Sequence, residues 1–299
     1  MRAGAAGDGV SVDIAVVVPA HNAAAYLAQA LASLQQQSLP PREVVVVDDA
    51  STDNTGDVAR QHGAVVLRQA ERRGPGAARN RGIGETRSPL IAFLDADDWF
   101  GPSKLERQSE RLRALGAQTC GTDAWVVDGD RVMRCKNEGR GVPGVLTLEK
   151  LMQGNPLICS TVMLRRDALE QVGVFDEDPA LIATEDYDLW LRLARREPIA
   201  YFDEPLAFYR VHKHSLSANT RFLRGVDRIM DKLQGAFADE PHFMHLVRRR
   251  RADVRLDLAW DLLQAGGRRG EARQLIREAS KHAFTLKGCR MWLRSLVAS

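Results

Sequence analysis

The sequence predicts an α/β fold built around a mainly parallel β-sheet, and three observations support this. Apolar runs of strand length alternate with helical patterns through the first hundred residues. These runs are continuous rather than alternating with polar residues, which is typical of strands that helices bury on both faces. Polar clusters follow three of the runs, at the carboxyl ends of parallel strands, where α/β sheets bind their ligands.

The expected elements follow one another in strand–helix order. The run at residues 14–18 ends in Pro19 and reads as the first strand. Residues 24–35 then carry apolar side chains at helical spacing, which predicts a helix. The cycle repeats, with further strands expected at residues 44–47, 64–67 and 90–94 and short helices at residues 55–62 and 76–84.

Length and composition indicate one large domain with an appendage. The chain has 299 residues, of which 44% are hydrophobic, so it can bury a sizeable core. The four cysteines lack the close pairing of a zinc site and would make a sparse disulfide framework. The first residues contain no apolar core of a signal peptide, and no run is long enough to span a membrane. We therefore expect a cytoplasmic protein.

The C-terminal region differs from the rest in charge. Residues 245–299 hold 13 Lys and Arg against 5 Asp and Glu, whereas the remainder of the chain is acidic. Apolar spacing predicts two helices around the Gly266-Gly267 turn. Such a basic hairpin suits docking beside an anionic membrane, but packing against the main domain or a second subunit is an equal alternative.

Polar clusters stand after the predicted strands as "PAHN" at residues 19–22, "DDASTDNT" at residues 48–55 and "DADD" at residues 95–98. In the second cluster the hydroxyl side chains and Asp53 are suited to cap the following helix. Capping does not account for Asp48 and Asp49, whose carboxylates could accept hydrogen bonds from a nucleobase and a ribose. The clusters therefore predict a nucleotide site.

The segment "RRGPGAARNRG", residues 72–82, offers glycines for close backbone approach and arginines that can offset phosphate charge. It does not fit a dinucleotide-binding motif, because its glycines do not follow the first strand. A Walker-type phosphate loop is excluded as well, since no Gly-Lys-Ser/Thr is present. What remains is a nucleotide recognised by carboxylates and held through a metal.

Three carboxylates, Asp95, Asp97 and Asp98, lie within four positions at the end of a predicted strand. Carboxylates this close repel one another unless a cation lies among them. A divalent cation that also binds the phosphates of a nucleotide would make the cluster tolerable. The purely structural alternative is a turn formed by aspartates.

Seven segments together resemble, in order and spacing, the family 2 glycosyltransferases of the GT-A fold: "VVVPAHNAAAYL", "VVVVDDASTDNT", "GPGAARNRGI", "IAFLDADD", "STVMLRRDALEQVGVFDE", "EDYDLWLRLA" and "YRVHKHSLS". The resemblance covers residues 13–217 and implies an inverting transferase that uses a nucleoside-diphosphate sugar with Mn²⁺ or Mg²⁺. We accordingly expect a flexible start at residues 1–11, a catalytic domain at residues 1–217 and a basic helical extension at residues 218–299. Within the catalytic domain, residues 13–100 would bind the nucleotide and residues 101–217 the acceptor.

The resemblance also implies roles for single residues on the donor side. The base pocket would be lined by Pro19, Ala20, His21 and Asn22, with Asp49 and Asp48 reading the base. The ribose and diphosphate would be approached by Arg79 and Asn80. The metal would bind Asp97, while Asp95 would hold the ribose or assist the metal. His21 departs from the tyrosine common in the family, which leaves the identity of the base open.

On the acceptor side, "TEDYDLW" at residues 184–190 predicts a helix start with Thr184 as N-cap. The resemblance makes Asp186 the catalytic base, with Glu185 as the alternative. Asp188 and Trp190 are expected to shape the acceptor site or pack the helix. His212, in "YRVHKH", matches a family contact with metal or diphosphate, and His214 is its alternative.

These expectations combine into a function. The chain would transfer a sugar, from a UDP-sugar by preference, to a hydroxyl of a saccharide or lipid-linked saccharide, either in the cytoplasm or peripherally at the membrane. One alternative is a sugar nucleotidyltransferase, although its glycine-rich, lysine-containing signature is absent. The other is a nucleic-acid-binding protein using "RRRR" at residues 248–251, although no aromatic platform accompanies this run.

Overall fold

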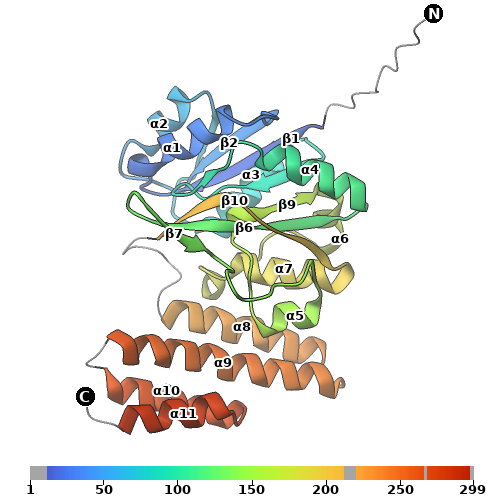
Figure 1. The fold of residues 1–299 in the computed structure, drawn as a ribbon. Helices are drawn as coiled ribbons and strands as arrows, with labels where there is room; N and C mark the ends of the chain where they lie inside the picture. The colour runs from blue at the N-terminus through green and yellow to red at the C-terminus, as the bar shows by residue number, and fades with distance from the viewer. Residues whose placement is uncertain (1–11, 212–219, 266–267, 297–299) are drawn as a thin grey trace, which may run out of the picture.

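The computed structural model of the chain describes residues 12–211, 220–265 and 268–296. Over these residues a ten-stranded mixed sheet runs through the upper body of the molecule, and a stack of helices lies beyond one of its faces (Figure 1). The main strand order is β3-β2-β1-β4-β9-β6-β10-β5, with β7 paired to β6 and β8 paired to β10. Hydrophobic cores lie on both faces of this sheet.

The first half of the sheet has the predicted alternation and the predicted parallel pairing. Its strands are β1 (Ile14–Ala20), β2 (Glu43–Asp48), β3 (Val65–Arg68) and β4 (Leu90–Phe93), and they pair with one another in parallel. The connecting helices are α1 (Ala24–Gln35), α2 (Thr55–Gln61) and α3 (Pro75–Glu85). A Cβ on Gly82 would lie 2.4 Å from a methyl carbon of Val17, so glycine lets α3 pack closely on β1.

The second half of the sheet is mixed. Strand β9 (Val162–Arg165) is antiparallel to both β4 and β6 (Thr119–Asp128), while β6 is parallel to β10 (Ile199–Val211). Strand β10 continues through Pro205, with shifts of register against β6 on either side of this residue. The remaining elements of this half are β5 (Trp99–Phe100), α4 (Lys104–Leu115), β7 (Arg131–Cys135), β8 (Val145–Leu146), α5 (Leu148–Gln153), η1 (Cys159–Thr161), α6 (Arg166–Val172), η2 (Pro179–Leu181) and α7 (Glu185–Arg196).

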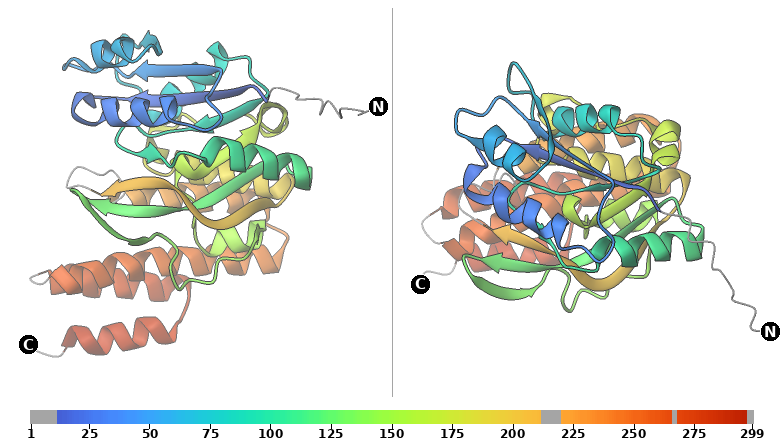
Figure 2. Two further views of the ribbon diagram at one scale, coloured as in Figure 1. Left: turned by 45° about the horizontal axis from the view of Figure 1, so that its top comes forward. Right: turned by 90° about the horizontal axis from the view of Figure 1, so that it is seen from above.

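Four helices follow the sheet: α8 (Thr220–Ala236), α9 (Pro241–Ala265), α10 (Arg269–His282) and α11 (Leu286–Leu296). Figures 1 and 2 place them on the side of the sheet remote from α1 and α2. The predicted helical pair is confirmed, since Leu256 and Ala259 of α9 pack with Ile276 and Ala279 of α10. None of the described helices combines the length and apolarity needed to cross a bilayer.

The C-terminal helices do not share a single core. Val226 and Met230 of α8, with Val247 and Val254 of α9, belong to the same buried cluster as the sheet and α7. The end of α9 packs instead with α10 and α11. A Cβ on Gly225 would lie 2.1 Å from the Thr184 hydroxyl oxygen, so a glycine is required where α8 crosses the start of α7. The helices α8 and α9 are thereby held directly against the element that carries Asp186.

Candidate active site

A cavity of about 770 Å³ opens at the carboxyl ends of β1, β2 and β4. These ends lie together because β1 runs between the other two strands in parallel register. The opposite wall comes from the second half of the chain. The predicted site residues among those that line the cavity are Pro19, Ala20, His21, Asn22, Asp49, Arg79, Asp95, Asp97, Glu185 and Asp186.

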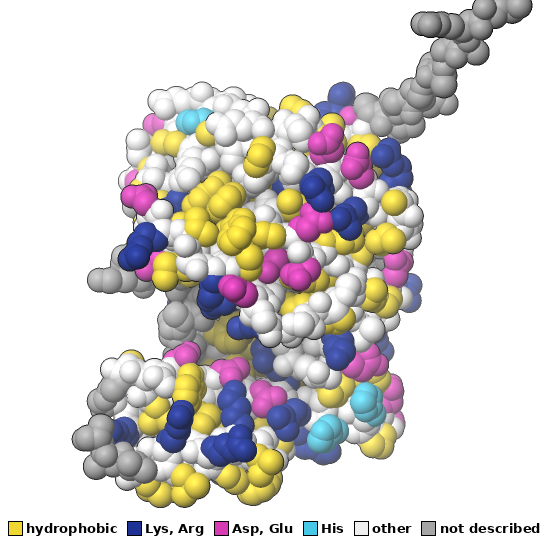
Figure 3. Space-filling model, in the orientation of Figure 1, with side chains coloured by type: hydrophobic (Ala, Val, Ile, Leu, Met, Phe, Trp, Pro, Cys, Tyr) yellow, Lys and Arg dark blue, Asp and Glu magenta, His cyan; other side chains and the backbone are white. Residues whose placement is uncertain are grey.

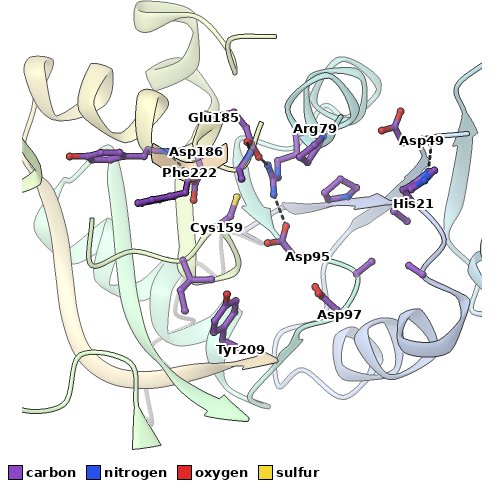
Figure 4. A pocket seen from close by; sticks show the side chains of 18 of the residues that line it. His21, Asp49, Arg79, Asp95, Asp97, Cys159, Glu185, Asp186, Tyr209 and Phe222 are labelled. Carbon is purple, nitrogen blue, oxygen red and sulfur yellow. Dashed lines mark hydrogen bonds and ion pairs between the residues drawn. The ribbon is translucent and has the colours of Figure 1, made fainter. Parts of the chain in front are cut away.

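The labelled side chains divide the cavity into two ends (Figure 4). His21 and Asp49 lie on one side, at the ends of β1 and β2, and Asp186 and Phe222 lie on the other. Arg79 and Asp95 lie between them. We call the His21 side the donor end and the Asp186 side the acceptor end.

The backbone at the donor end is held by the polar side chains that the sequence singled out. The His21 ring nitrogen Nδ1 lies 2.7 Å from the Asp49 carbonyl oxygen. Asn22 has a left-handed backbone, with φ of 49°, and its side chain accepts a hydrogen bond from the Thr52 N–H. The Asp49 carboxylate accepts hydrogen bonds from the N–H groups of Arg73 and Gly74. It thus fastens the loop before α3 to the end of β2 while lining the cavity.

The side chains of two predicted donor contacts, Asp48 and Asn80, have other hydrogen-bond partners in this structure. Asp48 is 1% exposed, lies outside the cavity lining, and accepts hydrogen bonds from the Ser51 N–H and from Arg68. These hydrogen bonds hold the turn after β2. The Asn80 amide donates to the Phe175 carbonyl and to Glu177, away from the cavity lining. It joins α3 to the loop that precedes α7.

The three aspartates of "DADD" have different surroundings. Asp95 and Asp97 line the cavity. Asp98 is 1% exposed and accepts hydrogen bonds from the Ser160 hydroxyl and the Arg210 N–H. Burial, followed by the charges of Asp97 and Asp95, raises the pKa of Asp98 well above its usual range. Asp98 therefore ties the loop after β4 to β10, and it does not line the cavity.

Arg79 joins the two halves of the site. Its guanidinium is buried and donates to Asp95 at 2.6 Å and to Glu185 at 2.7 Å. Its carbon Cζ also lies 5.3 Å from the centre of the Phe175 ring. Because Asp95 follows β4 and Glu185 is the first residue of α7, this double ion pair links the start of α7 to the end of β4. The arginine expected at the ribose and diphosphate lines the cavity, but its two terminal nitrogens are already bound to carboxylates.

The start of α7 places two carboxylates side by side in different roles. Glu185 accepts hydrogen bonds from Arg79 and from the Ala183 N–H, so both of its oxygens are engaged. Asp186 lines the cavity and accepts a hydrogen bond from the Tyr187 N–H. Burial, followed by the charge of Glu185, raises the pKa of Asp186 from 3.8 to about 7. Thr184 occupies the N-cap position, but its hydroxyl donates to the Leu181 carbonyl and does not cap the helix.

The interior beneath the site keeps α7 in place. Phe93 of β4, Phe175 and Trp190 of α7 form an aromatic cluster, with ring centres 5.1 to 6.3 Å apart. Each such pair contributes roughly 0.5–1.5 kcal/mol beyond its buried area. Asp188, buried on the same helix, pairs with Arg192 and Lys232. Asp188 and Trp190 thus pack the helix, which was one of the two roles expected for them, and neither lines the cavity.

Several lining residues were not predicted, notably Cys159, Tyr209, Phe222 and Arg250. Burial raises the pKa of the Cys159 thiol well above its usual range, which favours the neutral, unreactive form. Arg250 had a signal in the sequence, since Leu246, Arg250 and Val254 recur every four residues on one helix face. Within the continuous run of arginines at residues 248–251, the sequence does not distinguish Arg250 from its neighbours. His212 and His214 lie outside the described residues, and His212 as a metal ligand stays a prediction.

Comparisons with known proteins confirm the family that the sequence resembles and the fold class. The family model "Glycosyl transferase family 2" matches residues 15–173. A Bacillus subtilis protein named as a teichuronic acid biosynthesis glycosyltransferase, TuaG, is 30% identical over 214 residues, which cover 69% of this chain and 82% of the relative.

Two solved structures share the fold. TarS of S. aureus in complex with UDP-GlcNAc has a TM-score of 0.66 at 18% identity, covering 95% of this chain and 79% of that chain. The mannosyltransferase PcManGT of Pyrobaculum calidifontis, in complex with GDP-Man and Mn²⁺, has a TM-score of 0.61 at 20% identity, covering 94% of this chain and 78% of that chain. The extent of the family match and the relation to TuaG together show that this chain belongs to glycosyl transferase family 2.

Proposed function

We propose that this chain is an inverting glycosyltransferase that moves a hexosyl group from a nucleoside-diphosphate sugar, in the first instance a UDP-sugar, to an acceptor hydroxyl. The proposed mechanism rests on the position of the Asp186 carboxylate in the cavity and on its raised pKa. Its carboxylate lines the cavity, burial and Glu185 raise its pKa to about 7, and the oxygens of Glu185 are engaged by Arg79 and Ala183. A general base works best when its pKa is near the operating pH.

The donor end suits the nucleotide. Pro19, Ala20, His21 and Asn22 form its wall after β1, and Asp49 lines it after β2. Such a position at the carboxyl ends of parallel strands is where open α/β sheets bind nucleotides. The complexes of TarS with UDP-GlcNAc and of PcManGT with GDP-Man support a nucleotide-sugar donor for this fold.

The carboxylates after β4 fit a divalent cation that is shared with the donor. No group of three or more His, Cys, Asp or Glu within the described parts of the chain could hold a metal. Mg²⁺ and Mn²⁺ need only one or two carboxylates where substrate phosphates and water complete the coordination shell. Asp97 would be the principal ligand and Asp95 a second one, because Asp95 is only 30% exposed and already pairs with Arg79. The bound cation would supply positive charge that stabilises the departing diphosphate.

The transfer itself needs one base. Asp186 accepts the proton of the acceptor hydroxyl while the hydroxyl oxygen bonds to the anomeric carbon and the bond from that carbon to the diphosphate oxygen breaks. Attack from the face opposite the diphosphate inverts the anomeric centre. The proton ends on Asp186, the electron pair leaves with the nucleoside diphosphate, and no covalent enzyme intermediate forms. Arg79 holds Asp95 and Glu185 in place, so both ends of the cavity are positioned before the substrates bind.

The acceptor would be a saccharide or a lipid-linked saccharide, as in the synthesis of a cell-surface polysaccharide. The relation to TuaG supports this class of product. Contact with an anionic membrane would suit a lipid-linked acceptor, and α11 offers exposed Leu286 and Leu293 beside Lys287, Arg290 and Arg294. Figure 3 shows Lys and Arg side chains spread over the helical stack, with hydrophobic side chains along its lower edge. We call the five exposed α11 residues the α11 patch: Leu286, Lys287, Arg290, Leu293 and Arg294.

A donor screen tests the proposal directly. The purified chain is incubated with UDP-sugars and GDP-mannose, with Mn²⁺, with Mg²⁺ or with EDTA, and the release of nucleoside diphosphate is measured. We expect release from one donor class that EDTA abolishes, and NMR of the glycoside should show an inverted anomeric centre. Release that EDTA leaves unchanged contradicts the role of the metal, and retention of configuration contradicts direct displacement. Release of pyrophosphate from a nucleoside triphosphate and a sugar phosphate would favour a nucleotidyltransferase instead.

A further inference from the structure

A buried arginine from the C-terminal helices lines the acceptor end of the cavity. Arg250 lies on α9, is 7% exposed, and is among the lining residues. It shares its helix face with the buried Leu246 and Val254, so packing of α9 carries it inward. Sequence motifs of the catalytic part do not reach this position.

Arg250 differs from its neighbours in the described part of the chain in having no acidic partner there. Its Cζ lies 5.6 Å from the centre of the Tyr187 ring, and its Nε has no hydrogen-bond partner. Among the described residues, no carboxylate forms an ion pair with it. The flanking arginines differ: Arg251 and Arg255 both pair with Asp227, and Arg249 pairs with Asp253.

An arginine in this state is costly for the folded chain. The guanidinium cannot lose its charge at physiological pH, so burial cannot be relieved by deprotonation. Removing an unpaired charge from water costs several kcal/mol, and buried charges are therefore normally paired. A cation–π contact with Tyr187 offsets only part of this cost, roughly 0.5–2 kcal/mol. An anion that enters the cavity would supply the missing partner.

The position of Arg250 identifies which substrate could bring that anion. Arg250, Tyr187 and Asp186 all line the cavity, and Arg250 contacts the Tyr187 ring on α7, the helix that also carries the proposed base Asp186. The donor end, with His21 and Asp49, lies on the opposite side of the cavity (Figure 4). An anion held here would therefore belong to the acceptor and not to the donor diphosphate.

We propose that Arg250 binds a negatively charged group of the acceptor, a phosphate or a carboxylate, next to the hydroxyl that is glycosylated. This rests on the proposed transferase function and narrows its acceptor to an anionic saccharide. The planar guanidinium matches the two oxygens of either group. The C-terminal helices thereby complete the acceptor site and contribute to specificity.

The test compares three variants of the full chain. Arg250→Met keeps the length of the side chain and removes the charge, whereas Arg250→Lys keeps a charge. Arg255→Met is the matched control, because Arg255 is a similarly buried arginine of α9 that lines no part of the cavity. Each protein is assayed for kcat/KM with a neutral disaccharide, a uronic-acid disaccharide and a disaccharide phosphate, using the donor found in the screen.

We expect the wild type to prefer one of the two anionic acceptors, which also tells carboxylate from phosphate. Arg250→Met should lower kcat/KM for that acceptor about 10- to 100-fold, chiefly through KM, since a hydrogen bond to a charged group has this value. The neutral acceptor should be unaffected, Arg250→Lys should recover part of the loss, and Arg255→Met should retain the preference. Equal losses with charged and neutral acceptors, or a wild type that prefers the neutral disaccharide, overturn the proposal.

A binding measurement separates this proposal from the transferase function. Calorimetry follows glycerol 1-phosphate and glucuronate binding to protein saturated with UDP and Mn²⁺, so that the donor end is already filled. Binding of one probe that Arg250→Met abolishes and Arg255→Met retains supports the anion site, even if no donor is ever turned over. Binding of both probes that is unchanged in Arg250→Met, or no binding of either probe to the wild type, refutes it. Weaker UDP binding by Arg250→Met would assign the arginine to the donor and also refutes it.

Discussion

The two ends of the cavity are built in different ways. The donor end is made by the ends of neighbouring parallel strands, and its residues lie within the first hundred positions. The acceptor end is assembled from the start of α7, from α8 and from α9, which are joined by packing and not by a sheet register. A single arginine, Arg79, forms ion pairs with a carboxylate on each side.

Each end nevertheless uses its adjacent acids in the same manner. At the donor end Asp98 is buried and hydrogen-bonded to Ser160 and Arg210, while Asp97 lines the cavity. At the acceptor end both Glu185 and Asp186 line the cavity, but the two oxygens of Glu185 are engaged by Arg79 and by the Ala183 N–H. In both pairs the first-named acid is held by these structural contacts, and we propose that its neighbour takes part in the chemistry. The predictions below test this division of roles.

The largest effect is expected at the donor end. Asp97→Ala should abolish transfer, with a fall of roughly 10³-fold or more, because loss of a direct electrostatic contact with the leaving group costs several kcal/mol. Binding of the donor with Mn²⁺, measured by calorimetry, should weaken, while the melting temperature should stay near that of the wild type. Activity within about tenfold of the wild type would remove Asp97 from the metal site.

At the acceptor end, Asp186→Asn should keep the shape of the site but remove the base. We expect kcat to fall by roughly 10²- to 10⁴-fold, the usual value of general base catalysis. Donor and metal affinity should not change, which calorimetry with UDP and Mn²⁺ measures. If donor affinity falls together with kcat, Asp186 contacts the donor and is not simply the base.

Glu185→Gln should act on stability more than on chemistry. The substitution removes one of the two charges that compensate the buried Arg79, and breaking a buried ion pair costs about 3–5 kcal/mol. We expect a lower melting temperature together with a milder loss of kcat than Asp186→Asn causes. If the Glu185→Gln protein melts like the wild type but has lost its activity, Glu185 and not Asp186 is the base.

The raised pKa of Asp186 predicts two pH dependences. Because the base must be ionised, kcat should rise about tenfold per pH unit below the pKa of about 7 and level off above it. The folded state holds this proton more tightly than the unfolded chain, whose aspartate has a pKa of about 4. The contribution of Asp186 to stability is therefore present at low pH and is lost as pH rises from about 4 to about 7.

The variant Asp186→Asn is the control for both curves, because asparagine does not ionise. Its residual activity should lose the dependence on pH near 7, and its free energy of unfolding should lack the part of the decline that Asp186 causes. Chemical denaturation of both proteins across this pH range measures the difference. Parallel stability curves would show that the carboxyl group has an ordinary pKa.

The smallest effect is expected at the α11 patch. Leu286→Ser with Leu293→Ser should weaken binding to anionic vesicles several-fold while soluble donor binding is retained, because both side chains are exposed. Co-sedimentation at two salt concentrations measures this, and binding should weaken with salt. Exposed Leu115 on α4 offers a matched control substitution. If the wild type, the double variant and the Leu115 control bind vesicles equally, the α11 patch does not contact the membrane.

Substitution is preferable to truncation here because of the packing of α9. A chain ending near residue 239 would lose Leu246, Val247 and Val254 from the core that carries α7. Loss of activity in such a truncation would reflect damage to the acceptor end as well as any loss of membrane contact.

The sequence by itself determined the donor end. Continuous apolar runs such as residues 14–18 and 90–94 can be buried only as central strands, and parallel strands must place their carboxyl ends at one edge. The local sequence pattern alone therefore predicted that one site contains His21, Asp49 and Asp97. The motif that begins α7 likewise marked Asp186 and Glu185 without any knowledge of their contacts.

The tertiary structure decided which acids of each cluster face the cavity. Asp48 and Asn80 were assigned to the donor from their positions, yet Arg68 and the loop at residues 175–177 engage their side chains. Adjacent carboxylates have the same chemistry in a sequence. The partners that distinguish them lie far along the chain: Arg68 is 20 positions from Asp48, and Arg210 is 112 positions from Asp98, so no local pattern contains them.

The contribution of the C-terminal helices was also decided only in three dimensions. The sequence shows the charge of the four consecutive arginines but not the direction of each side chain. On α9 successive side chains point to different sides of the helix. Arg249 and Arg251 meet aspartates, whereas Arg250 is turned into the cavity because Leu246 and Val254 pack on the same face. Helix rotation is fixed by such packing, and packing depends on partners that are distant in the sequence.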